Sequence, residues 1–187
     1  MKRVKFVFIF IALFVATLTI YGQSAIEKQI SRLNEVSSVP YICRSKIGDL
    51  GCGDALFWTI VRGKLAAVPL LIEKLDDSTR TLNPVPNTGG DYTVADLALA
   101  ALREIIYGIP ILELAEDPDS PEPRNGGQGY WNYTRRKHAN RIKFKKRVAD
   151  WFDANRGRLI WVKSDRPLSC DCFFAHPNGG HYTVKQK

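Results

Sequence analysis

The sequence predicts an all-α fold, and three observations support this class. Apolar residues recur at intervals of three and four along most of the chain after residue 24, which is the spacing of one helix face. Residues that begin and end helices stand at the edges of these segments. No segment shows the sustained alternation of apolar and polar residues that builds a sheet. We therefore expect a single helical domain over residues 25–187.

Residues 1–24 have the layout of a secretory signal peptide. A positive start precedes residues 6–21, which carry no charge, and Gly22 and Ser24 put small residues at the positions that a signal peptidase reads. We expect cleavage before Ala25 and an exported protein, periplasmic or secreted, with no stable membrane span. An uncleaved anchor is the alternative, although the apolar run is shorter than the ~20 residues of a spanning helix.

Three helices are predicted early in the exported chain. The first covers residues 25–35. Asp54 can cap the second, whose apolar residues recur at helical spacing until Gly63 ends it. The third follows closely and tolerates Pro69, because this proline falls in its first turn.

The clearest predicted helix follows a loop over residues 76–92 that is rich in Asn, Pro and Gly. Thr93 and Asp96 resemble a capping box, in which the threonine oxygen accepts a backbone N–H at the start of a helix. Gly108 and Pro110 end this helix.

A second long loop and a second long helix complete the pattern. Residues 115–129 hold prolines and glycines beside a cluster of acidic residues, and loops of this length are usually functional or mobile. The last long helix is expected over residues 131–155, and Gly157 ends it. Residues 159–162 can be extended, and residues 163–187 are expected to form an irregular tail.

Several of these segments resemble known helical repeats. The helix pair over residues 53–77 and the helix over residues 92–108 look like helical hairpins of the HEAT type. Residues 144–155 and then 159–162 are similar to the closing helix of small bacterial HEAT-like proteins. The whole chain resembles exported HEAT-like helical-repeat proteins of bacteria in the Bacteroides group. The resemblance implies a small right-handed α-α superhelix of HEAT-like hairpins with long loops, and it implies no activity.

A short motif occurs twice. Residues 86–94 read Pro-Asn-Thr-Gly-Gly-Asp-Tyr-Thr-Val, and residues 177–184 read Pro-Asn-Gly-Gly-His-Tyr-Thr-Val. The first copy encodes a turn and a helix start. No helix can follow the second copy, in which His181 replaces Asp91, so a separate role for this copy stays open.

The four cysteines are candidates for disulfides, because an exported protein meets an oxidising compartment. They are Cys43, Cys52, Cys170 and Cys172. The first two would close a short loop, whereas a bond between the last two would be strained, so cross-pairing of the two regions is an alternative.

The tail also carries the residue types of a zinc site. Cys170, Cys172, His176 and His181 lie within a short stretch, but the spacing of the cysteines differs from that of common zinc knuckles. We prefer disulfides and expect no metal or other cofactor. Cys52 precedes a helix and is a candidate nucleophile, although a disulfide cysteine between turn glycines is the preferred interpretation.

The strongest charge feature is a basic run over residues 135–147, in a chain whose net charge is +8. The predicted binding residues lie on the helix side away from the apolar stripe, with one aromatic residue at its start: Arg135, Arg136, Lys143, Lys146, Arg147 and Trp131. Export argues against nucleic acid, so we expect a protein or an anionic envelope glycan as the partner. The alternative is a solvated helix face that the acidic loop partly neutralises.

Three function classes follow. The preferred one is an exported helical-repeat binding module for a protein or an anionic envelope polymer. A periplasmic inhibitor or immunity-type protein is the second, and a small Cys- or metal-dependent hydrolase is the third. The first is preferred because the chain shows helix packing and long loops but no spaced catalytic set.

Overall fold

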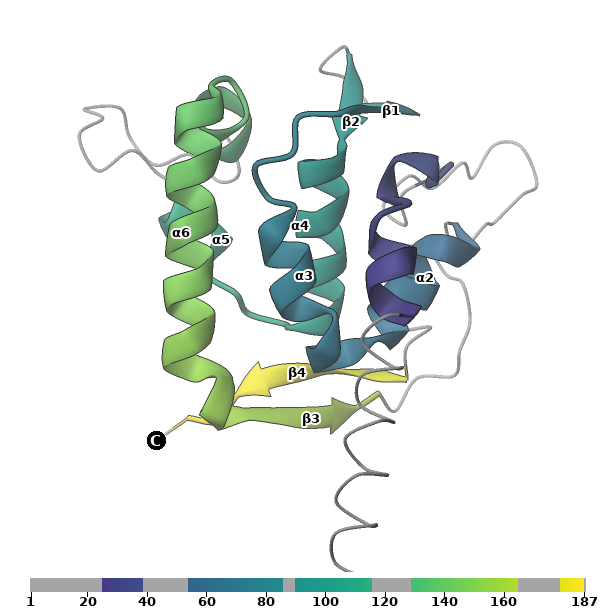
Figure 1. Cartoon of the computed structure of the whole chain (residues 1–187). Helices are drawn as coiled ribbons and strands as arrows, with labels where there is room; N and C mark the ends of the chain where they lie inside the picture. The colour runs from purple at the N-terminus through teal and green to yellow at the C-terminus, as the bar shows by residue number, and fades with distance from the viewer. Residues whose placement is uncertain (1–24, 39–53, 86–89, 116–128, 165–178, 187) are drawn as a thin grey trace, which may run out of the picture.

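The computed structural model describes residues 25–38, 54–85, 90–115, 129–164 and 179–186. These residues form short helices and two antiparallel sheets of two strands each (Figure 1). The predicted all-α, HEAT-like superhelix is therefore wrong. Two strands lie in the segment expected to be a loop and one lies in the expected irregular tail, whereas the strand over residues 159–163 falls where extended chain was predicted. The described helices do not stack as repeated hairpins.

Asp54 ties the beginning of the described chain to the next helix. A helix over residues 25–30 and the 3-10 turn η1 (Leu33–Glu35) come first, and they bury Ile26, Ile30 and Leu33. As predicted, Asp54 caps α2 (Ala55–Arg62), because its Oδ1 accepts from the backbone N–H of the second helical residue at 2.7 Å. Its Oδ2 accepts from the hydroxyl of Ser37 at 2.6 Å, which fixes the first segment against α2.

A sharp turn joins α2 to α3 (Val68–Glu73) through the 3-10 turn η2 (Lys64–Ala66). Pro69 lies in the first turn of α3, as predicted. Among the described residues no single helix is long and apolar enough to cross a membrane. α2 and the segment Lys64–Glu73 pass that test together by length and composition, but they are bent by 96°.

The first sheet lies in the segment predicted as a loop. β1 (Arg80–Pro84) pairs with β2 (Asp91–Thr93), and its burial pattern is inverted, since Leu82 is 94% exposed while Asn83 is buried. The side-chain amide of Asn83 donates to the backbone carbonyl of Val36, so the inward-facing polar group is satisfied. Hydrophobic alternation does not detect such a strand, because its buried side chains are polar.

α4 (Val94–Ile105) is the central helix and begins where the sequence predicts. The backbone N–H of Thr93 donates to Oδ2 of Asp96 at 2.7 Å, and Oγ1 of Thr93 accepts from the backbone N–H of Asp96 at 3.4 Å. The apolar face of α4 packs against α2 and α3. Gly108, with a φ of 84°, reverses the chain after the helix.

The predicted last long helix is divided in two. α5 (Ile111–Ala115) is followed by the π-helical turn η3 (Tyr130–Thr134) and then by α6 (His138–Asn155). Lys137 has extended backbone angles and separates η3 from α6. α6 packs against α3 and α5, and the residues of its apolar stripe, Phe144, Val148 and Phe152, are buried.

The second sheet lies across the lower end of the helices in Figure 1. The 3-10 turn η4 (Arg156–Arg158) leads into β3 (Leu159–Lys163), which pairs with β4 (Gly180–Val184). The backbone N–H of Tyr107 donates to the carbonyl of Tyr182 at 2.8 Å, so β4 also contacts the chain just after α4. Residues 180–184 of the second copy of the repeated motif therefore form a strand, although an irregular tail was predicted there.

Candidate binding surface

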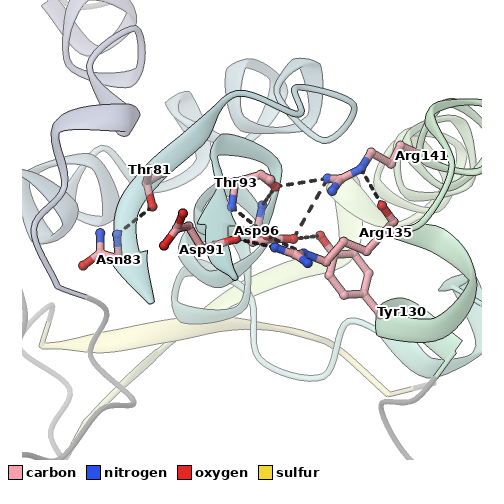
Figure 2. A network of polar contacts seen from close by, with 8 residues as sticks. All are labelled: Thr81, Asn83, Asp91, Thr93, Asp96, Tyr130, Arg135 and Arg141. Atoms are coloured by element: carbon pink, nitrogen blue, oxygen red, sulfur yellow. Dashed lines mark hydrogen bonds and ion pairs between the residues drawn. The ribbon is translucent and has the colours of Figure 1, made fainter. Parts of the chain in front are cut away.

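Asp96 is the centre of a buried polar network (Figure 2). The residue is only 5% exposed although it carries a carboxylate. Its Oδ1 accepts from the hydroxyl of Tyr130 at 2.6 Å, and its Oδ2 accepts from Nε of Arg135 at 3.0 Å. A buried carboxylate is tolerated when it is paired and hydrogen-bonded. The helix-start residue of α4 therefore also holds the π-helical turn in place.

A second guanidinium group, that of Arg141, joins the network from α6. The residue is 3% exposed, and its Nη1 lies 4.0 Å from Oδ1 of Asp96 and donates to Oγ1 of Thr93 at 3.2 Å. Its Nε donates to the backbone carbonyl of Arg135 at 3.3 Å. The carboxylate of Asp96 therefore forms ion pairs with two guanidinium groups. This arrangement leaves positive charge in excess where α4 meets α6.

Arg135 links the network to a pair of aromatic rings. Its Nη2 donates to the backbone carbonyl of Asp91, and its guanidinium carbon lies 5.1 Å from the centre of the Trp131 ring. The rings of Trp131 and Tyr92 are 6.0 Å apart between centres, and both side chains are half-buried. A planar guanidinium group can hydrogen-bond at its edge while its face packs on an aromatic ring. Arg135 therefore fixes Trp131 relative to β2 and α4.

The predicted binding residues separate into two groups in the structure. Arg135 and Arg147 point toward the protein, since Arg135 binds Asp96 and Nη1 of Arg147 donates to the carbonyl of Leu114 at 3.1 Å. Lys146 is exposed but pairs with Asp150 at 2.6 Å. Within the basic run over residues 135–147, the cations that are exposed and have no ion pair among the described residues are Arg136, Lys137 and Lys143. We call these three cations, together with Tyr92 and Trp131, the cationic surface.

Two basic residues of α6 lie near the apolar stripe of the helix, a position from which a long side chain ordinarily carries its charge out to solvent. Arg141 is instead buried in the Asp96 network. Lys145 is half-buried, and its Nζ lies 2.7 Å from a carboxylate oxygen of Glu73 and 3.3 Å from one of Asp76. The position of Arg141 on the apolar side of the helix was the sequence signal that could have indicated a buried carboxylate partner.

The residues predicted for disulfides or metal binding form no site in the described part of the chain. His181 is half-buried on β4, and its ring centre lies 5.1 Å from that of Tyr107. The predicted signal segment, residues 1–24, lies outside the described residues, as do Cys43, Cys52, Cys170, Cys172 and His176. Within the described ranges there is no pair of cysteines placed for a disulfide and no group of three or more metal-ligating side chains.

No protein-family model, curated protein or solved structure matches the chain. The cationic surface is therefore interpreted from its own geometry and charge.

Burial gives the Asp96 network a measurable pH dependence. The pKa of Tyr130 is raised well above its ordinary value of 10.0, because burial and the nearby Asp96 carboxylate disfavour the phenolate. Above about pH 10 the unfolded chain releases this proton while the folded chain retains it, so the free energy of unfolding falls as pH rises. We expect Tyr130→Phe to cost about 1 kcal/mol near neutral pH, through the lost hydrogen bond, and to flatten the alkaline decline.

Urea unfolding of the wild type and Tyr130→Phe, from neutral pH to about pH 11, measures both effects. Tyr107→Phe is the matched control, since Tyr107 is 66% exposed and lies outside the Asp96 network. An equal decline in the wild type and in Tyr130→Phe would contradict the burial of this hydroxyl.

Proposed function

We propose that this protein is a binding module whose cationic surface holds an anionic polymer. Arg136, Lys137 and Lys143 carry this proposal, because they are exposed and have no ion pair among the residues that the structure describes. Exposed charges of one sign attract oppositely charged ligands and raise their association rate. Without residues 1–24, which hold three of the basic residues and no acidic one, 24 basic and 19 acidic residues leave a net charge of +5, and it adds a long-range contribution of the same sign.

The buried network supports the proposal in a second way. Asp96 fixes Arg135 and Tyr130, and through them it fixes the turn that precedes Arg136 and Lys137. A surface that is ordered before binding loses less conformational entropy when the ligand binds. The network also contributes its second guanidinium group, Arg141, to the positive charge beneath the surface.

An exported location, predicted from residues 1–24, is part of this proposal. It would bring the cationic surface into contact with acidic polymers of the cell envelope or the medium. The helical-repeat scaffold that was first expected is not needed, because the surface is built from β2, η3 and α6 around one buried carboxylate.

A triple substitution tests the proposal. We expect Arg136→Ala, Lys137→Ala and Lys143→Ala together to weaken the binding of a polyanion such as polygalacturonate about tenfold, as about 0.5 kcal/mol per exposed charge implies. Isothermal titration calorimetry at low ionic strength measures the affinity. The matched control also removes three positive charges, by alanine substitution of the exposed residues Lys28, Arg62 and Lys185, which are not part of the cationic surface.

The control triple variant should bind within about twofold of the wild type, because its three substituted residues are not part of the cationic surface. Equal losses in the two triple variants would mean that only net charge matters and would contradict a localised site. A wild-type protein that binds no polyanion would also contradict the proposal.

A further inference from the structure

We infer that the anionic polymer is a polysaccharide, with one sugar ring packed against the Tyr92–Trp131 pair and its acidic groups bound by the neighbouring cations. This inference rests on the proposed function. It concerns the chemical class of the ligand, which the charges alone do not distinguish. An acidic peptide would satisfy the same cations.

The aromatic pair is the feature that favours a sugar. Tyr92 comes from β2 and Trp131 from η3, and their rings are tilted by 60° at 6.0 Å between centres. Both side chains keep part of their surface exposed. The face of a sugar ring presents C–H groups, which pack favourably on the electron-rich face of an aromatic ring. A glutamate or aspartate side chain offers no comparable surface.

The pair is held rigidly, as a binding platform should be. Trp131 packs against Arg135 on one side and edge-on against Tyr130, whose ring centre lies 5.7 Å away. Arg135 and Tyr130 are both hydrogen-bonded to the buried carboxylate of Asp96. The positive charge of Arg135 is thus already matched, and its part is to position Trp131 rather than to bind the ligand.

Two of the three cations follow the aromatic part of the surface directly along the chain. Arg136 and Lys137 follow Arg135 along the chain, and both are exposed. Lys143 lies on the exposed side of α6, six residues further along the chain than Lys137. A linear polymer with acidic groups on its rings can meet the aromatic pair together with Arg136 and Lys137, which follow Arg135 directly.

Two polymers of similar length and charge test the inference, namely polygalacturonate and polyglutamate. We expect Trp131→Ala to weaken the binding of polygalacturonate about tenfold and to leave that of polyglutamate within about twofold. Tyr92→Ala should show the same selectivity. Arg135→Lys keeps the charge but loses the planar stacking group, and it should also weaken only polygalacturonate.

Tyr107→Ala is the aromatic control, because Tyr107 is exposed and lies outside the cationic surface. Circular dichroism and thermal unfolding show which variants are folded, and Arg135→Lys decides the matter if neither alanine variant folds. Equal effects on both polymers, or on neither, overturn the polysaccharide inference. In that case the triple charge variant still reports on the proposed function, since its loss of affinity is expected for both polymers.

Discussion

Asp96→Ala is expected to destabilise the protein by about 3–5 kcal/mol, because it leaves the buried Arg141 without a carboxylate partner. Asp96 is also the second residue of the capping box of α4, and it accepts a hydrogen bond from the hydroxyl of Tyr130. Removing the carboxylate therefore leaves a buried cation, a buried hydroxyl and a helix start unsatisfied at once. These contributions share partners, so their separate costs do not add.

Urea unfolding measures this effect, and Asp150→Ala is its control. Asp150 forms an exposed ion pair with Lys146 on α6, and its loss should cost less than about 1 kcal/mol. Adding Arg141→Met to Asp96→Ala should recover part of the stability, because the uncompensated cation is then removed. Equal destabilisation by the two aspartate substitutions would contradict the buried network.

Gly180→Ala is expected to disrupt the pairing of β3 with β4, at a cost of about 2–5 kcal/mol from strain and overpacking together. Gly180 is buried and has a φ of 152°. A Cβ at this position would lie 2.2 Å from the backbone carbonyl oxygen of Val162 and 2.9 Å from the side chain of Trp161. A backbone oxygen cannot rotate away, so the two strands must separate.

Hydrogen exchange at the Tyr107 amide reports on this change, since that amide donates to Tyr182 on β4. We expect faster exchange there in Gly180→Ala and a lower free energy of unfolding. Gly157→Ala is the control, because a Cβ there would meet nothing within 4 Å. Unchanged exchange and stability in Gly180→Ala would contradict the register of the second sheet.

The features that could be predicted from the sequence are local ones. A capping box needs only a side chain and a backbone group three residues apart. Thr93 and Asp96 therefore predicted the start of α4 correctly. The cap at Asp54 and the position of Pro69 were found for the same reason. The apolar stripe of α6 was also correct, because helical spacing is visible within a single segment.

The features that were missed depend on distant partners. β4 pairs with a strand that ends at Lys163, and β1 turns polar side chains inward to meet Val36. Neither arrangement leaves an alternating hydrophobic pattern. Asp96 was identified as a helix-start residue, but its hydrogen bonds to Tyr130 and Arg135 join residues that are 34 and 39 positions apart in the sequence. Only the fold brings these groups together.

The location of polymer binding is the central claim, and nuclear magnetic resonance titration tests it most directly. Amide signals of the ¹⁵N-labelled protein are followed while an oligogalacturonate is added. We predict that the largest shifts occur at Tyr92, at Trp131 and over residues 135–143, with little change in β3 and β4. Shifts centred on the second sheet, or spread evenly over all exposed lysines and arginines, would contradict a binding site organised around Asp96.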